Sequence, residues 1–180
     1  MAPARARIIE PDETANSGED PQFRMPPFSR SLPMLLSWAR EAVMKRFRAS
    51  LQSHGFSEQQ WRIVRALSEA GSLDIVALSE RCCILPASLS RILPKLSADG
   101  LITRGSDTAD QRCVIVSLTA EGRRRCESAV EDFEPIYAQM TRDIGAERAA
   151  QVNLVLEDLI DRLAADKPAR RDKAKRQRAP

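Results

Sequence analysis

The chain has 180 residues, of which 43% are hydrophobic and 4% aromatic, and its formal net charge is +3. This length is enough for one domain with a buried core, and the abundance of leucine, alanine and arginine indicates a largely helical protein. No apolar run is long enough to cross a membrane and the N-terminus does not resemble a signal peptide, so we expect a cytoplasmic protein.

Histidine and cysteine positions argue against a metal centre. His54 is the single histidine, and none of the four cysteines shows CxxC spacing. We therefore expect no metal, and we expect buried or half-buried thiols in a reducing cytosol. The chain also lacks a glycine-rich phosphate loop and a nucleophile elbow, which argues against an enzyme and against a bound cofactor. The cysteines are Cys82, Cys83, Cys113 and Cys126.

The first part of the chain predicts an arm followed by a long helix. Residues 1–30 hold five of the eleven prolines and few apolar residues, which is typical of a disordered or loosely docked segment. From Ser31 to about Gln52 apolar residues recur every three or four positions, which predicts a helix that Gly55 ends. Residues 31–56 form this first helical segment, and its apolar positions are Leu32, Leu35, Leu36, Ala39, Val43, Phe47 and Leu51.

The next helix carries two start signals. The run from Ser57 to Gln60 fits a capping box, and Phe56 can pack on Trp61 as a hydrophobic staple. This helix should run to about Ala70, before Gly71. Asp74 can then cap a short helix over residues 75–81.

Residues 82–119 predict a second short helix followed by a β-hairpin. Apolar side chains between Leu85 and Gly100 follow the spacing of one buried helical stripe, and Gly100 supplies a left-handed stop. Two short β-branched runs then flank a turn-rich tip. The segment from Arg81 to Arg125 holds eight basic against four acidic residues, the pattern of a localised phosphate-binding face. The stripe consists of Leu89, Ile92, Leu93 and Leu96, and Ser88, Arg91 and Lys95 share the opposite face.

Two further helices close the domain. Thr119 can cap a long helix in which Pro135 should cause a bend or a split, and a last helix should run from about Ala146 to Ala164. Residues 166–180 carry seven basic and two acidic residues and should form a solvated basic tail.

The order of these elements, with Asp110-Gln-Arg112 leading into Leu118-Thr119-Ala-Glu-Gly122, resembles the MarR family of bacterial transcription regulators. The resemblance covers about residues 31–165. Three shorter stretches are similar to the subgroup of homoprotocatechuate-operon regulators, and regulators of nicotinate breakdown are also similar. These stretches are Ala39-Arg40-Glu41-Ala42, Glu58-Gln-Gln-Trp-Arg-Ile63 and Cys83-Ile-Leu-Pro-Ala-Ser-Leu89.

This resemblance implies a fold that is mainly α with a small β-hairpin wing (α+β). Residues 57–118 would form a winged helix-turn-helix lobe, and residues 31–56 and 119–165 would supply dimerisation helices. The implied protein is a homodimer that represses transcription from a pseudo-palindromic operator in double-stranded DNA. A small aromatic carboxylic acid would release it by binding between the dimerisation helices and the lobe. The alternative is a thiol-based redox regulator, although peroxide-sensing relatives carry their thiol near the start of the first helix, where this chain has none.

Candidate DNA contacts lie on the second helix of the motif and on the wing. Side chains on the first turns of such a helix reach base edges, and arginine can bind guanine through two hydrogen bonds. By resemblance, Arg112 enters the minor groove while Asp110 holds its guanidinium, although a purely structural turn pair is the alternative. The candidate set is Ser88, Ser90, Arg91, Lys95, Arg104, Asp110 and Arg112.

An aromatic acid requires a cation for its carboxylate and flat apolar walls for its ring. We expect Arg40, on the first helix near Ser37, to supply the cation. Trp61 is either a structural anchor or a pocket wall, and His54 either caps a helix end or donates to a ligand hydroxyl. The candidate set for the effector is Ser37, Arg40, His54, Trp61, Arg62 and Arg65.

Overall fold

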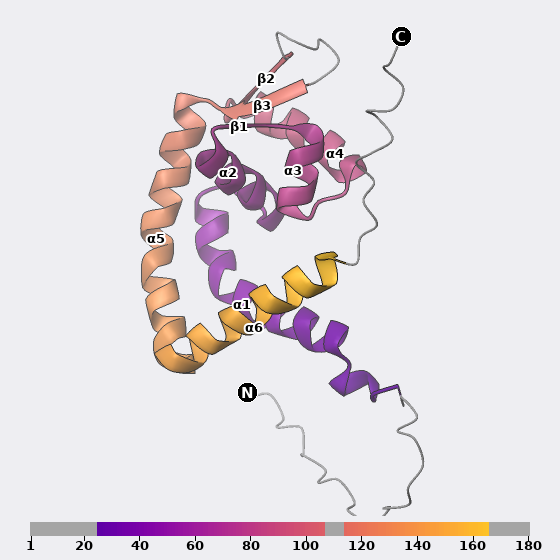
Figure 1. Cartoon of the computed structure of the whole chain (residues 1–180). Coiled ribbons are helices and arrows are strands. Elements are labelled where there is room, and N and C mark those ends of the chain that lie inside the picture. The colour runs from indigo at the N-terminus through magenta and orange to yellow at the C-terminus, as the bar shows by residue number, and fades with distance from the viewer. Residues whose placement is uncertain (1–24, 107–113, 166–180) are drawn as a thin grey trace, which may run out of the picture. The chain divides into compact units, whose positions relative to one another are not determined.

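The computed structural model describes residues 25–106 and 114–165 (Figure 1). Residues 1–40 and 41–180 form two compact units, which are described separately below. The predicted basic tail and residues 1–24 of the predicted arm lie outside the described residues. None of the described helices is both long and apolar enough to span a bilayer. The helices are η1 (Phe28–Arg30, a 3-10 helix), α1 (Leu32–Ser53), α2 (Glu58–Ala70), α3 (Ile75–Cys82), α4 (Pro86–Ala98), α5 (Ala120–Ile144) and α6 (Ala146–Ala165).

The described part of the first unit contains η1 and the beginning of α1. The rings of Phe28 and Trp38 meet edge to face, with centroids 6.3 Å apart. Leu32, Leu35 and Leu36 are exposed on the first turns of α1. The described residues of the unit therefore leave these three side chains of the predicted stripe only partly covered.

The helix starts of the second unit follow the predicted caps. Ser57 Oγ accepts a hydrogen bond from Gln60 N, and Gln60 Oε1 accepts one from Ser57 N, so the capping box is complete. Asp74 caps α3 through Ala77 N, and Thr119 caps α5 through Gly122 N. These local bonds satisfy backbone donors that have no partner inside a helix.

The sheet has one strand more than the predicted hairpin. Strand β3 (Val114–Leu118) lies between β2 (Ile102–Ser106) and the three-residue strand β1 (Ser72–Asp74), and all pairs are antiparallel. We expected only the end of one helix and the cap of the next at these residues. Three residues are too few for an alternating pattern, and their strand state comes from backbone pairing with β3, for example Leu73 opposite Val116.

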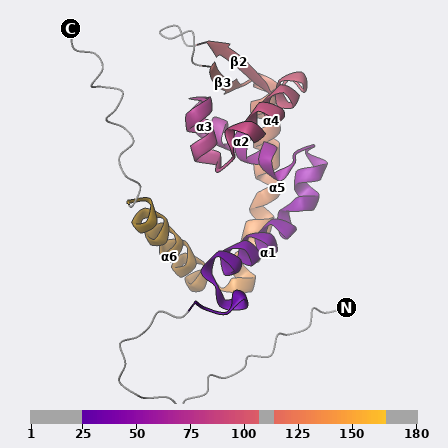
Figure 2. The ribbon, with the colours of Figure 1, turned by 90° about the vertical axis from the view of Figure 1, so that its right-hand side faces the viewer.

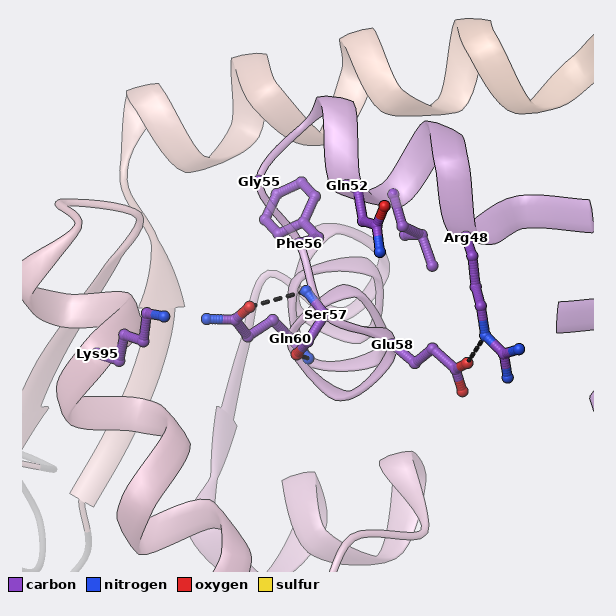
Figure 3. A pocket seen from close by; sticks show the side chains of 9 residues that line it. Arg48, Gln52, Gly55, Phe56, Ser57, Glu58, Gln60 and Lys95 are labelled. Carbon is purple, nitrogen blue, oxygen red and sulfur yellow. Dashed lines mark hydrogen bonds and ion pairs between the residues drawn. The ribbon is translucent and has the colours of Figure 1, made fainter. Parts of the chain in front are cut away.

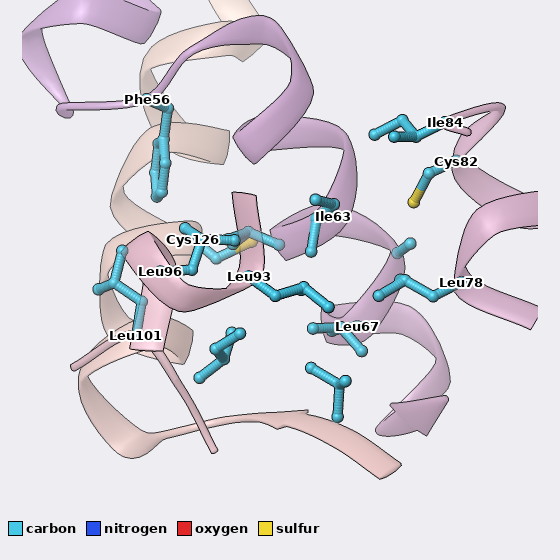
Figure 4. Close-up of a cluster of buried hydrophobic side chains, with 14 of the residues drawn as sticks. Phe56, Ile63, Leu67, Leu78, Cys82, Ile84, Leu93, Leu96, Leu101 and Cys126 are labelled. Atoms are coloured by element: carbon cyan, nitrogen blue, oxygen red, sulfur yellow. The ribbon is translucent and has the colours of Figure 1, made fainter. Parts of the chain in front are cut away.

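The core of the second unit lies between α2, α3, α4, α5 and the sheet (Figures 2 and 4). Helix α2 supplies Ile63, Val64 and Leu67, all fully buried, and the stripe predicted for α4 packs on them. The buried side chains of α4 are Leu89, Leu93 and Leu96. A single apolar cluster thus fixes the orientation of α4 and its exposed face.

Two prolines lie inside uninterrupted helices. Pro135 does not split α5, which corrects one of the two outcomes expected for it, and Pro94 lies within a continuous α4. Each proline lacks the backbone N–H that would donate to the carbonyl of the residue four positions earlier. Those residues, Glu131 and Ser90, are exposed, so water can satisfy their carbonyl groups and the helices continue.

Candidate DNA interface and aromatic cavity

Helix α4 presents its cations to solvent. Arg91 and Lys95 are exposed, while Ser88 is half-buried. Ser90 is exposed, and its hydroxyl donates to the Ala87 carbonyl at 2.8 Å, a bond within the helix. The predicted polar face is therefore present, with the two cations as its most accessible members.

A tight turn joins α3 to α4, and it fixes the angle between them. Cys83 adopts the left-handed conformation at φ 49°, and Ser79 Oγ donates to the Ile84 carbonyl at 2.7 Å. Arg62 reaches across from α2 and donates from Nη1 to the Cys82 carbonyl at 2.7 Å. This contact gives Arg62, one of the predicted ligand residues, a structural partner in the turn.

The wing is described only in part. Arg104 is exposed on β2, as a phosphate contact requires, and Thr103 Oγ1 lies 2.9 Å from Ser117 Oγ across the hairpin. Asp110 and Arg112 lie outside the described residues.

His54 does not act as the predicted helix cap. Its Nε2 lies 2.8 Å from Asp132 Oδ2, and its side chain is 13% exposed. The bond joins the end of α1 to α5, 78 residues further along the chain, so no local pattern predicted it.

Trp61 and α5 form an aromatic cavity, defined here as the pocket of about 270 Å³ lined by Trp61, Arg65, Val130, Phe133, Glu134 and Tyr137. The rings of Trp61 and Phe133 meet nearly edge to face, with centroids 4.8 Å apart. Trp61 also packs on Phe56, so it serves as the predicted staple and as a pocket wall. The sequence patterns did not identify Phe133 and Tyr137 as lining residues.

Arg65 brings a cation to the aromatic cavity. Its Nη2 lies 3.1 Å from Glu69 Oε1, and the other carboxylate oxygen of Glu69 lies 3.1 Å from Arg81 Nη2. All three side chains are about half exposed, and such surface pairs contribute little stability. The Arg65 guanidinium can therefore exchange Glu69 for the carboxylate of a ligand at low cost.

Ser37 and Arg40 belong to the first unit, where both are exposed on α1. The Ser37 hydroxyl donates to the Pro33 carbonyl at 2.8 Å. Their roles as effector contacts remain predictions.

The described thiols differ in accessibility. Cys82 and Cys126 are buried, and burial raises the pKa of both thiols. Cys83 is exposed, which corrects the expectation that the thiols are buried or half-buried. No cluster of potential metal ligands occurs in residues 25–106 or 114–165.

We expect Cys83 to react with iodoacetamide before Cys82 and Cys126 in the native protein at pH 8. The two buried thiols are shielded, and their raised pKa lowers the fraction of reactive thiolate. Peptide mass spectrometry after timed labelling measures the order, with urea-denatured protein as the control. Equal labelling rates at Cys83 and Cys126 in the native state would contradict this arrangement.

A short helix pair followed by a β-wing, with exposed cations on the second helix, defines a winged helix-turn-helix DNA-binding protein. Comparison with known proteins agrees with this class. The MarR family model matches residues 56–114. The chain is 42% identical over 130 residues to the homoprotocatechuate degradative operon repressor of Escherichia coli, a match that covers 72% of this chain and 88% of that protein. The HTH-type transcriptional regulator FarR of Neisseria gonorrhoeae is 39% identical, over 74% of this chain and 89% of that protein.

A solved structure is similar as well. The crystal structure of NadR in complex with 4-hydroxyphenylacetate shares 39% identity and a TM-score of 0.65, and the match covers 78% of this chain and 98% of that one. The chain therefore belongs to the MarR family of transcriptional regulators. This confirms the family and the fold class expected from the sequence.

Proposed function

We propose that the chain is a dimeric repressor of an operon for the breakdown of an aromatic acid similar to homoprotocatechuate or hydroxynicotinate. A small aromatic acid releases it from its operator. The observation that carries this proposal is the aromatic cavity, because it combines flat apolar walls from Trp61 and Phe133 with the guanidinium of Arg65. Such a pairing suits a ring that bears a carboxylate.

The cavity offers complementary groups for such an acid. Arg65 receives the carboxylate, and the exposed Tyr137 and Glu134 provide hydrogen-bonding partners for a ring hydroxyl or a ring nitrogen. Arg40 and Ser37 are the further contacts proposed from the sequence. Support also comes from NadR, a relative of similar sequence whose structure contains 4-hydroxyphenylacetate.

The proposed DNA contacts combine base and phosphate recognition. Arg91 on α4 reads a base in the major groove, and Lys95 and Arg104 bind phosphates. Arg112, with Asp110 as its support, enters the minor groove of the flanking DNA. A two-fold dimer then reads the two halves of a pseudo-palindromic duplex.

The exposed apolar side chains of α6 support the dimer. Val152, Val155 and Leu163 recur along α6 at helical spacing, and all three are more than half exposed in the single chain. Apolar residues repeated along one helix face are usually covered by a partner. A second copy of the chain is the partner that the proposed operator symmetry requires.

Replacing Arg65 or Arg40 by alanine is expected to leave operator binding intact while blunting release by the effector. Loss of a hydrogen bond to a charged group typically costs about 1.5–3 kcal/mol, so the concentration for half-release should rise roughly 10- to 100-fold. Fluorescence anisotropy on the promoter fragment of its own operon, titrated with 4-hydroxyphenylacetate, homoprotocatechuate and 6-hydroxynicotinate, measures this change.

Arg142→Ala serves as the matched control, because Arg142 is exposed on α5 and does not line the aromatic cavity. Normal release in the Arg65 variant would place the effector outside the aromatic cavity. If release is normal in the Arg40 variant but impaired in the Arg65 variant, Arg40 is not an effector contact.

A further inference from the structure

A second and larger cavity lies at the junction of α1, α2 and α4 in the second unit. Its volume is about 440 Å³, and it shares no lining residue with the aromatic cavity. We call it the Lys95 cavity, after the cation that α4 contributes. It is lined by Arg48, Leu51, Gln52, Gly55, Phe56, Ser57, Glu58, Gln60 and Lys95 (Figure 3).

Gln60 is the buried polar group of this cavity, with 7% of its surface exposed. Its Oε1 accepts a hydrogen bond from Ser57 N at 2.8 Å. A backbone N–H can only donate, so this bond fixes which end of the amide is oxygen and which is nitrogen. The Nε2 group is therefore the end that points into the cavity, toward Lys95 (Figure 3).

Two donors thus converge without an acceptor between them. Lys95 is a cation that can only donate, and the Gln60 Nε2 group can also only donate. Within residues 25–106 and 114–165, neither group has a hydrogen-bonding partner. The nearby carboxylate of Glu58 is engaged by Arg48 Nε at 3.1 Å, and Arg48 also binds Glu41 through both oxygens.

The remaining surroundings suit an anion. The cavity includes the first turn of α2, where the helix dipole favours negative charge. Leu51 and Phe56 line it as well, and both side chains are almost fully buried, so part of the cavity is apolar. An oxygen of a carboxylate or phosphate would accept from both Gln60 and Lys95.

We propose that the Lys95 cavity is an oxyanion site, distinct from the aromatic cavity, in which Gln60 Nε2 and Lys95 Nζ bind one carboxylate or phosphate group. The oxyanion comes either from a free small acid or from the DNA backbone. In the first case the acid and the DNA compete for Lys95, and in the second case Gln60 becomes a phosphate contact beside it. The site extends the proposed function, because effector release through the aromatic cavity does not require Gln60.

The side-chain amide of Gln60 reports directly on this site in ¹⁵N–¹H NMR spectra of the full chain, and its absence from the Gln60→Glu spectrum assigns it. A saturable shift of this resonance with inorganic phosphate or sodium benzoate, at constant ionic strength, identifies a free oxyanion as the occupant. A shift that occurs only with the promoter duplex identifies the DNA phosphate. If the resonance shifts with none of these probes, the proposal is overturned.

The variants test the roles of the two donors. Gln60→Glu keeps the acceptor of the capping box but replaces the donor with a negative charge, whereas Gln59→Glu makes the same charge change at an exposed position outside the cavity. Affinity for the occupant identified by NMR should fall roughly tenfold or more in Gln60→Glu and in Lys95→Gln. If Gln60→Glu and Gln59→Glu bind this occupant with equal affinity, the assignment of Gln60 is overturned. This holds whether or not effector release through the aromatic cavity is normal.

Discussion

Replacing Gly122 by alanine is expected to lower the free energy of unfolding by about 3 kcal/mol. A Cβ atom at this position would lie 2.0 Å from the Leu101 carbonyl oxygen and 2.9 Å from its carbon. These are backbone atoms, so no side-chain rotation can relieve the overlap. The same carbonyl accepts a hydrogen bond from Thr119 N at 3.1 Å, which holds the start of α5 against the beginning of the wing.

Thermal unfolding measures this loss, and for a domain of this size it corresponds to a fall in Tm of roughly 6–12 °C. Gly105→Ala is the control, because a Cβ at Gly105 in β2 meets no atom within 4 Å. The control should change stability by less than about 0.5 kcal/mol. If the two variants unfold at the same temperature, the close approach of α5 to Leu101 is not what requires glycine in the Leu-Thr-x-x-Gly motif.

Local patterns predicted the helices of the lobe well because their start signals are short-range. The caps at Ser57, Asp74 and Thr119 each act over three residues, and the stripe on α4 repeats over about two turns. These signals lie in the sequence itself and do not depend on the rest of the fold. The exposed positions of Arg91 and Lys95 followed from the stripe on the other face of the same helix.

The features that the sequence did not predict depend on distant contacts. Strand β1 exists through its pairing with β3, more than 40 positions later. The bond between His54 and Asp132 and the packing of Trp61 on Phe133 both join α5 to earlier helices. The role of Arg62 likewise required the position of the Cys82 carbonyl, which the turn after α3 determines. Aromatic residues on an apolar helix stripe have the same spacing whether they fill the core or line a cavity, so the sequence pattern does not distinguish the two roles.

The two cavities suggest different routes from ligand to DNA. The aromatic cavity lies between α2 and α5, so an acid bound there would act at a distance from α4, through the position of the lobe relative to the proposed dimerisation helices. An oxyanion in the Lys95 cavity acts on α4 itself, because Lys95 is both a lining residue and a proposed phosphate contact. If the occupant of the Lys95 cavity is a free acid, ligands in both cavities would therefore weaken operator binding by two independent contributions.

Replacing Arg91 by alanine is expected to lower affinity for the promoter fragment by about 1–3 kcal/mol, which is roughly 5- to 150-fold, without changing thermal stability. Arg91 is exposed and forms no ion pair or side-chain hydrogen bond with the described residues of the lobe, so we expect its replacement to remove the proposed DNA contact and to leave the packing intact. Fluorescence anisotropy with the promoter duplex and with a scrambled duplex measures affinity and specificity. Arg112→Ala should act similarly at the flanks of the site.

Salt dependence separates base reading from phosphate binding. Loss of the Lys95 charge in Lys95→Gln should reduce the slope of log K against log salt by about 1 and weaken both duplexes equally, because phosphates carry no sequence information. Arg91→Ala should weaken binding to the promoter more than to the scrambled duplex. Equal losses on the two duplexes would make Arg91 a phosphate contact, and sequence recognition would then have to come from the wing or from DNA shape.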